Sequence, residues 1–459
     1  MKKTIALCCF LSLGIMSFGQ TSAFNFSAED SLNNTWHQMG VFTGSKKAFS
    51  FMGSFDLDID KKRGLASNNL LGVQFQKSFK NASLKIAPYI FVKSSSRDNH
   101  NEDYRIGTLY EIKNNNAYRV DALINWQWNP MPYIRLEAGK NKHQLGKGIN
   151  SLLWSGNGGP SWFANASLNT KKISYRTQLN AIPESDKNNV KWIANHTVTV
   201  DLPKDWQISL FETVAWAAND SSYNRGFDWQ YMAPTVIYRP TEFHGGSADN
   251  VLIGLDWSGS LSKNIFTYGQ LVIDEFWLEE IKKQEGWWAN KYGGQVGLGW
   301  KTKKHFAQAE INVVRPFTYS HANTVIAFTN QVVPLAAWDG AGFVEGVMVL
   351  KATINKNLIL GFMSSIGSYK VRNSVNYGGD PFESYLTLDD TRNHTIVGAN
   401  NEIIGRVAFS SSYQFKTDTS WLLSVWTGVD VHKKRNTMNP WVQLKWSNTL
   451  FANFSKKTR

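Results

Sequence analysis

Hydrophobic and polar residues alternate with period two from about Asn69 to Asn448. The pattern is clearest in VDALINWQWNP (120–130), NVLIGLDWSGSL (250–261) and KYGGQVGLGWK (291–301). Successive side chains of a strand point to opposite faces, so each stretch predicts a strand with one apolar and one polar face. In the second stretch one face carries Val251, Ile253, Leu255 and Trp257, and the other carries Gly254, Asp256 and Ser258.

The residue types on the two faces favour a membrane barrel over a soluble sheet. A soluble β-sandwich or a propeller would alternate too. Here, however, the polar faces are rich in glycine and small residues, and the apolar faces end in aromatic rings, of which the chain has 19 Trp, 16 Tyr and 27 Phe. No helical period is long enough to cover a sheet, and closure satisfies every backbone group in a bilayer. The pattern predicts an all-β, antiparallel outer-membrane β-barrel of about sixteen to eighteen strands, each needing about 9–11 residues.

The N-terminal residues predict export. Residues 1–19 carry Lys2 and Lys3, then an uncharged apolar run, which is typical of a signal peptide cleaved after Gly19 or, alternatively, after Ala23. Both cysteines lie within this segment, so the exported chain would contain no thiol. Residues 20–50 form an N-terminal segment in which Ser27 predicts a short helix, and residues 51–459 form the predicted barrel.

The charge balance favours anionic partners. The chain has 49 basic and 36 acidic residues, a net charge of +13. Acidic glycans and the phosphates of lipopolysaccharide fit such a charge, although a solvated basic surface with no specific partner explains it equally well. We expect contact with outer-membrane lipid and lipopolysaccharide, and no nucleic-acid partner for an exported chain.

Sequence signatures of enzymes are absent. The chain has no GxSxG, HExxH, phosphate-binding or dinucleotide motif, and its nine histidines show no metal-ligand spacing. Carboxylate pairs such as Asp274 with Glu275 are adjacent in sequence, so they would point to opposite faces of a strand rather than face each other across a sugar. We therefore predict a non-enzymatic protein with no cofactor and no metal.

A crowded polar stretch, VIYRPTEFHGGSADNVLIGLDW (236–257), allows three interpretations. It could be an acid–base site, a ligand site, or a polar connection with a lumen-facing ladder, in which Arg239 and Glu242 pair. The stretch lacks a nucleophile in a recognisable turn, so we favour the polar connection. Its candidate lumen or glycan contacts are Arg239, Glu242, His244, Asp249 and Asn250.

Three further stretches supply candidate contacts with a glycan or with the lumen. In GWWANK (286–291), Trp287 and Trp288 could stack on sugar rings beside Asn290 and Lys291, although interfacial anchoring of the aromatic pair is the simpler interpretation. INVVRPFTYSHAN (311–323) adds a basic, a phenolic and an imidazole group at a strand end, and NYGGDPFESY (376–385) contains a tight turn. The remaining candidates are Asp274, Arg315, Tyr319, His321 and Asp380.

Several of these stretches, taken in order, resemble the Wzi-type capsule-assembly family of outer-membrane proteins, in the Bacteroidetes branch that includes RemB-type gliding proteins. The matching segments are 139–160, 225–257, 268–276, 286–299, 314–323 and 376–385. The resemblance implies an eighteen-stranded barrel with a largely occluded lumen, minor helical elements toward the periplasmic side, and a lectin-like role in retaining surface polysaccharide.

Three functions remain open on the sequence. The first is a glycan-binding barrel without catalysis; the second is a porin or exporter for anionic solutes. The third is an accessory subunit of a secretion or gliding-motility complex, whose loops would bind proteins. Steady large channels would favour the porin, and co-purification with a stoichiometric partner would favour the subunit.

Overall fold

A computed structural model describes most of the chain after residue 48. The described residues are 49–60, 64–95, 111–113, 116–155, 160–183, 190–218, 226–233, 249–330, 333–337, 339–370, 377–378, 381, 383–385, 392–398, 400–414, 421–432 and 437–448. The predicted signal peptide, its cleavage site and the predicted helix near Ser27 lie outside these residues. So do four candidate residues: Arg239, Glu242, His244 and Asp380.

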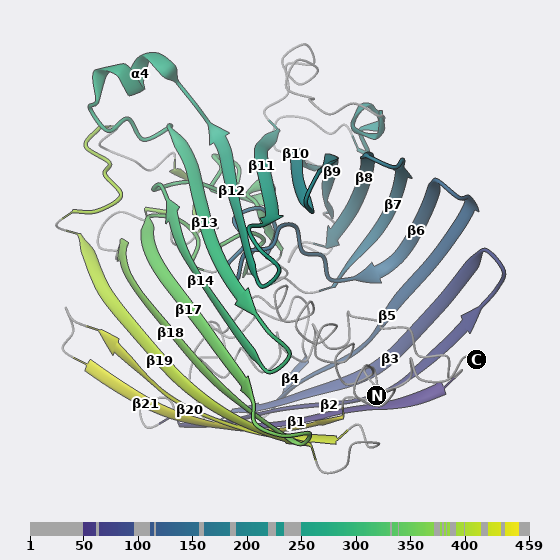
Figure 1. The fold of residues 1–459 in the computed structure, drawn as a ribbon. Helices are drawn as coiled ribbons and strands as arrows, with labels where there is room; N and C mark the ends of the chain where they lie inside the picture. The colour runs from purple at the N-terminus through teal and green to yellow at the C-terminus, as the bar shows by residue number, and fades with distance from the viewer. Residues whose placement is uncertain are drawn as a thin grey trace.

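The strands close into one antiparallel ring (Figure 1). The 19-stranded sheet includes β4, a three-residue strand beside β5, and the other 18 strands form a barrel that closes where β21 pairs with β1. The all-β barrel prediction is therefore confirmed, with the strand number at the upper end of the predicted range. The strands are β1 (Phe49–Asp60), β2 (Gly64–Ser78), β3 (Ala82–Ser95), β4 (Glu111–Lys113), β5 (Asn116–Met131), β6 (Ile134–Asn141), β7 (Ser161–Asn169), β8 (Ile173–Pro183), β9 (Val190–Leu202), β10 (Trp206–Ala217), β11 (Asn250–Ser260), β12 (Ile265–Glu275), β13 (Lys291–Lys301), β14 (His305–Val314), β17 (Phe343–Thr353), β18 (Leu358–Lys370), β19 (Asn401–Gln414), β20 (Trp421–His432) and β21 (Thr437–Asn448).

The two ends of the barrel differ. At one end, which we call the turn end, short connections such as 170–172, 203–205 and 302–304 join neighbouring strands. At the other, the loop end, lie long connections such as 276–290 and 315–342. These connections hold the short elements η2 (Trp229–Met232), α4 (Leu278–Lys283), η3 (Thr324–Ile326), β15 (Thr329–Asn330) and β16 (Val333–Pro334). Among the described residues, no helix has the length and apolar character needed to cross a membrane.

Alternation along β13 illustrates how the sequence builds two faces. Val296, Leu298 and Trp300 point outward and are 52%, 53% and 42% exposed, whereas the residues between them are buried. At one of these, Gly297, an added Cβ would lie 2.1 Å from the Tyr268 ring of β12. Glycine here lets an inward aromatic ring lie flat over its neighbouring strand. The period-two pattern thus predicted the orientation of these side chains correctly.

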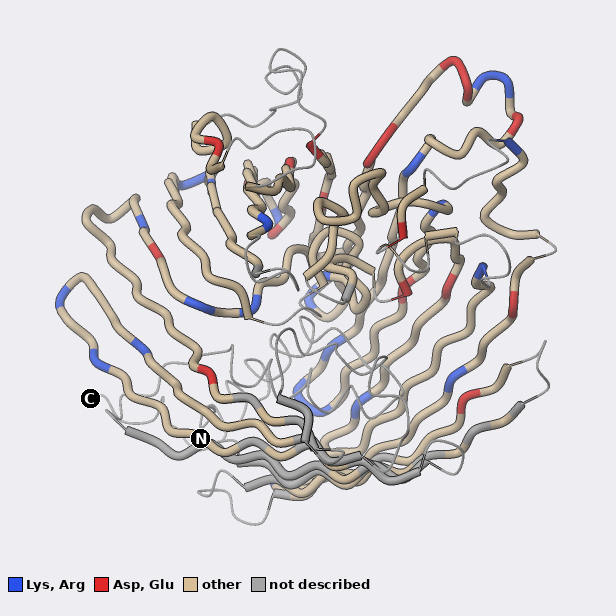
Figure 2. The backbone as a smooth tube through the Cα atoms, turned by 180° about the vertical axis from the view of Figure 1, so that it is seen from behind, with Lys and Arg blue, Asp and Glu red and all other residues tan. Residues whose placement is uncertain are grey.

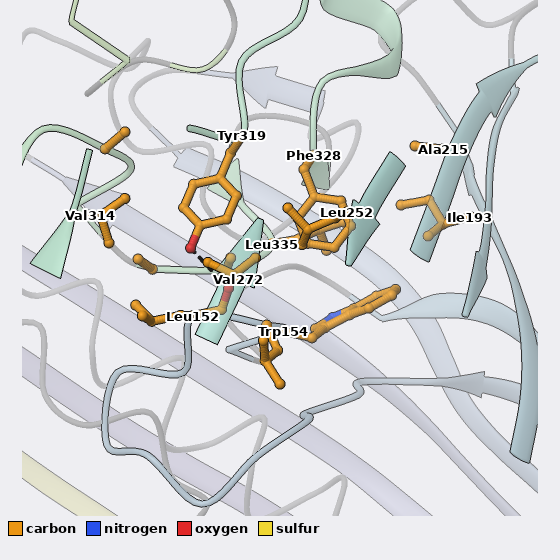
Figure 3. Close-up of a cluster of buried hydrophobic side chains, with 14 of the residues drawn as sticks. Leu152, Trp154, Ile193, Ala215, Leu252, Val272, Val314, Tyr319, Phe328 and Leu335 are labelled. Atoms are coloured by element: carbon orange, nitrogen blue, oxygen red, sulfur yellow. Dashed lines mark hydrogen bonds between the residues drawn. The ribbon is translucent and has the colours of Figure 1, made fainter. Parts of the chain in front are cut away.

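Two segments from the loop end fold into the barrel and form a core inside it. They are 142–155 and the described residues of 315–341, and their buried side chains, including Trp154, Tyr319 and Phe328, pack together (Figure 3). This core touches Ile193, Phe211, Ala215 and Leu252 on one side of the wall, and Val314, Phe343 and Tyr369 on another. These wall residues come from neighbouring strands between β9 and β18, so the core covers the inner face of this part of the wall. The largely occluded lumen that the family resemblance implies stays a prediction.

A third segment, 226–233, covers part of the outer face. Its Tyr231 packs with Ala194, Val214, Trp216 and Val251 of β9, β10 and β11. Beneath it the outward His196 is fully buried, and its Nε2 lies 3.1 Å from the backbone oxygen of Tyr231. Asp249 belongs here, since its carboxylate accepts a hydrogen bond from the Tyr231 hydroxyl at 2.5 Å. The candidate Asp249 is therefore on the outside of the barrel, apart from the lumen.

Candidate functional site

The inner segment 149–152 is held by side chains of the barrel wall. The Glu310 carboxylate of β14 accepts hydrogen bonds from the backbone N–H groups of Ile149 and Asn150, at 2.6 and 2.8 Å. It also accepts one from the Tyr268 hydroxyl at 2.7 Å. On β12, Gln270 accepts from the Leu152 backbone N–H at 2.8 Å. Charge-assisted bonds to backbone donors are strong in a buried site, so these contacts fix the path of the segment.

Further along the wall the same pattern continues. Gln295 of β13 donates to the backbone oxygen of Asn150 at 2.7 Å, and the Asn150 side chain reaches Glu345 of β17 at 3.4 Å. Glu345 also accepts from the Tyr369 hydroxyl at 2.7 Å. Polar side chains on consecutive strands are thus used to bind a peptide segment, which explains why inward positions of these strands are polar.

At the loop end, Asp274 joins the second inner segment to the wall. Its carboxylate accepts a hydrogen bond from the Tyr319 backbone N–H at 2.8 Å. The Tyr319 hydroxyl in turn donates to the backbone oxygen of Leu152 at 2.9 Å, the dashed line in Figure 3. Tyr319 adopts a left-handed φ of 74°, an uncommon conformation that these contacts stabilise. Two sequence-predicted candidates, Asp274 and Tyr319, therefore meet and connect both inner segments.

Lys291 is the buried cation of this region. Its Nζ lies 2.9 Å from Glu275, donates to the backbone oxygen of Ser320 at 3.1 Å, and sits 4.1 Å from the centre of the Tyr385 ring. The centre of the Trp288 ring lies 5.3 Å from the same Nζ atom, and this ring packs against the ring of Tyr385. A buried charge needs such compensation, which the carboxylate, the carbonyl and the ring faces provide together.

The register of β12 and β13 shifts between Ile273 and Glu275. Because of this irregularity, Asp274 and Glu275 both contribute to the same region although they are adjacent in sequence. Strict alternation would have placed them on opposite faces, and that expectation is wrong for this pair. The two carboxylates bind an N–H group and a lysine, respectively, so they do not form a facing acid–base pair.

Trp287 and Arg315 complete the region on its solvent side. Arg315 donates to the backbone oxygens of Trp287 and His394, at 3.3 and 2.8 Å, and the guanidinium of Arg392 lies 5.1 Å from the Trp287 ring. The indole N–H of Trp287 has no hydrogen-bond partner among the described residues. The ring is half-buried, but its nitrogen atom is itself buried, so a ligand would meet the ring rather than this donor.

The helix α4 adds charges beside these aromatic rings. Figure 2 shows acidic and basic residues following one another along this loop, at the top right of the view. Glu280 pairs with Lys283 at 2.6 Å and with Arg392 at 2.8 Å, and these two donors lower the pKa of the Glu280 carboxyl below its usual value. The carboxylate is therefore ionised at neutral pH and holds Arg392 near Trp287.

We call this group the mouth cluster, defined by Asp274, Glu275, Trp287, Trp288, Asn290, Lys291, Arg315, Tyr319, His321, Tyr385 and Arg392. Eight of its members are sequence-predicted candidates. Asn290 accepts from the Trp277 backbone N–H at 2.7 Å, and His321 packs 6.1 Å from Tyr385. Two described candidates lie outside the cluster: Asp249, on the outer face, and Asn250, which lies inside the barrel and donates to the backbone oxygen of Ile326 at 3.0 Å.

Sequence reasoning missed Glu275, Tyr385 and Arg392 as members of the cluster. Tyr385 ends the stretch NYGGDPFESY, which was singled out only for its turn, and Arg392 lies in a long connection without alternation. Nothing in a single sequence indicates that residue 392 lies beside residue 280. Glu275 could have been found only from the register shift before GWWANK, and the alternation of hydrophobic and polar residues does not reveal that shift.

The mouth cluster offers ring faces with hydrogen-bonding groups around them. Its aromatic rings and cationic groups match the stacking surfaces and donors that a saccharide uses. Among the described residues no group of three or more His, Cys, Asp or Glu side chains could hold a metal ion. Its carboxylates are occupied by backbone donors and cations, so the arrangement suits binding rather than acid–base chemistry.

Comparisons with solved structures agree with the barrel. The chain is similar to Wzi, an outer-membrane protein involved in group 1 capsule assembly in Escherichia coli and described as a carbohydrate-binding β-barrel: TM-score 0.57, 11% identity, covering 92% of this chain and 89% of that one. It also matches OprD of Pseudomonas aeruginosa, with a TM-score of 0.47, 6% identity and coverage of 88% and 97%. No protein-family model and no curated protein matches the sequence. The likeness to Wzi shows a shared barrel fold.

Proposed function

We propose that this chain is a non-enzymatic outer-membrane barrel that binds or organises cell-surface polysaccharide, as in capsule assembly or attachment. The mouth cluster carries this proposal. It presents half-buried tryptophans and hydrogen-bonding groups at the loop end, which faces the cell exterior in barrels of this kind. The apolar outward face, seen on β13, supports insertion into the lipid of the outer membrane after export by the N-terminal signal.

The core inside the barrel argues against the second candidate, a porin or exporter for anionic solutes. Trp154, Tyr319 and Phe328 lie inside the barrel, together with the inner segments that carry them. A passive pore needs a continuous aqueous path, and we expect the core and the inner segment bound by Glu310 to narrow that path. The resemblance to Wzi-type proteins supports the polysaccharide role and a membrane setting with lipopolysaccharide.

An accessory subunit of a secretion or gliding-motility complex is the remaining alternative. Trp229 in the segment on the outer face is 76% exposed, and a large exposed aromatic ring is common at protein interfaces. A stoichiometric partner that co-purifies in mild detergent and is lost with Trp229→Ala would favour this alternative. If other variants release the partner and Trp229→Ala does not, the exposed ring of Trp229 no longer supports this alternative.

The polysaccharide role predicts that Trp287→Ala weakens glycan binding. Loss of a stacked ring costs about 1–2 kcal/mol, so Kd should rise about fivefold to thirtyfold. The measurement is binding of the purified, detergent-solubilised protein to a panel of acidic and neutral surface polysaccharides.

Trp229→Ala is the matched control, because it removes an exposed ring of the same kind far from the mouth cluster. Retention of the heat-dependent gel shift shows that each variant is still a folded barrel. If the parent protein binds none of the polysaccharides, or if both tryptophan variants bind as the parent does, the proposed function is wrong.

A further inference from the structure

A second polar site lies on the inner wall near the turn end, apart from the mouth cluster. Arg135 of β6, Ser167 of β7 and Arg176 of β8 are direct cross-strand neighbours, because Arg135 pairs with Ser167 and Ser167 pairs with Arg176. By the alternation of their strands, all three side chains point into the barrel, on the same face as the buried Asn165 and Gln178. Neighbouring strands are about 4.8 Å apart, so the two arginines start about 10 Å from each other with only a serine between them.

Among the described residues, the Glu137 carboxylate forms an ion pair with Arg135 and not with Arg176. Arg135 donates to Glu137, whose other oxygen accepts from the Asn165 side chain at 2.8 Å. Arg176 donates to Asn165 at 3.1 Å and to Gln178, which are neutral amides. The charges of Arg135 and Arg176 repel each other, and Glu137 is the acid that attracts Arg176. Two cations on one anion leave an excess positive charge on this part of the wall.

This excess is accessible from the lumen. The Arg135 side chain is 46% exposed although its strand position points into the barrel. Charge that only stabilised the wall would be expected to be paired one to one and covered, as Lys291 is at the mouth cluster. Arginine presents its donors in a planar fork that matches carboxylate and phosphate oxygens, and the serine between the two forks leaves space for such a group.

We propose that Arg135, Ser167 and Arg176 bind an anionic group of an acidic saccharide, with Asn165 and Gln178 holding the two arginines in position. On β8 (Ile173–Pro183) this site lies at the turn end, whereas the core contacts Ile182 at the loop end of the same strand. If the barrel is oriented as the proposed function requires, the turn end faces the periplasm. The arginine site then receives the saccharide on the inner side of the membrane, and the mouth cluster contacts it outside; this assignment of sides rests on the proposed function.

The test uses the full chain in detergent, where both ends of the barrel are accessible. Oligogalacturonate serves as the acidic probe, and maltohexaose as a neutral probe of similar length. In the double variant Arg135→Gln with Arg176→Gln, affinity for oligogalacturonate should fall about tenfold to a hundredfold, since charge-assisted hydrogen bonds contribute about 1.5–3 kcal/mol. Binding by the parent should weaken with added salt.

Lys172→Gln is the matched control, because it removes an exposed positive charge from the neighbouring turn between β7 and β8. Equal loss in this control, unchanged binding in the double variant, or equal binding of maltohexaose by the parent would each overturn the proposal. Competition by inorganic phosphate assigns the site to phosphate-bearing glycans, and its absence assigns the site to uronic-acid carboxylates. Both results support an anionic group as the ligand.

The same experiment separates this proposal from the proposed function. Trp287→Ala should weaken polysaccharide binding at the mouth cluster while leaving the arginine-dependent binding of oligogalacturonate intact. If no surface polysaccharide binds but the double variant still loses oligogalacturonate, the proposed function fails and the arginine site stands. If polysaccharide binds and depends on Trp287 alone, the arginine site fails and the proposed function stands.

Discussion

Replacing Glu310 with alanine is expected to open an ion-conducting path through the barrel. The carboxylate accepts hydrogen bonds from two backbone N–H groups of the segment 149–152, from Tyr268, and from Asn312 at 3.0 Å. Its removal leaves four buried donors without this acceptor, each at a cost of about 1–3 kcal/mol where water does not replace it. The strands keep their backbone hydrogen bonds to one another, so the substitution destabilises the inner segment rather than the barrel.

Conductance of single barrels in planar lipid bilayers measures this effect. The parent should give closed traces, and Glu310→Ala should give frequent openings. Ile311→Ala is the control: its side chain is the next on β14, points outward, and is 55% exposed. Glu310→Gln, which keeps one acceptor oxygen, should give an intermediate frequency. Closed traces from Glu310→Ala, in a barrel that retains its heat-dependent gel shift, would mean that this carboxylate does not hold the inner segment.

The barrel was predictable from sequence because the signal is local. Alternation along β13 gives the orientation of Val296, Leu298 and Trp300 without any knowledge of the partner strands, since neighbouring residues in a strand always face opposite ways. The same rule predicted that Val251 to Trp257 would alternate between an outward and an inward face. That Asp256 faces the lumen is seen in its 3.3 Å contact with Gln270 of β12.

The mouth cluster was only partly predictable because its contacts are not local. GWWANK supplied the tryptophans and Lys291, but the partners of that lysine come from positions 275, 320 and 385. The irregular register at Glu275 reverses the alternation rule at one residue, and no composition signal marks it. The stretch around Arg239 illustrates the limit, because its crowded charges attracted attention while Asp249, at its end, contacts Tyr231 on the outer face.

Replacing Lys291 with methionine is expected to destabilise the mouth cluster more than any other single change there. The side chain is fully buried, and the substitution keeps its length but removes the cation that faces Glu275. The Glu275 carboxylate would then be left in a partly buried site beside Asp274 with no cation at 2.9 Å. Breaking one side of a buried ion pair costs about 3–5 kcal/mol. The result should be local opening of the segment 315–330, seen as faster cleavage there by a protease.

Lys283→Met is the matched control, because Lys283 pairs with Glu280 at the surface and is 49% exposed. A surface pair contributes about 0–1 kcal/mol, so the cleavage rate should stay near that of the parent. The double variant Lys291→Met with Glu275→Leu gives the sharpest test. If the penalty arises from the unpaired carboxylate, removing that carboxylate should restore much of the protection, because an apolar pair of similar volume can replace a buried ion pair. Equal cleavage in the single and double variants would instead attribute the penalty to lost contacts of Lys291 with Ser320 and the ring of Tyr385, and the ion pair would have no part in holding the mouth cluster closed.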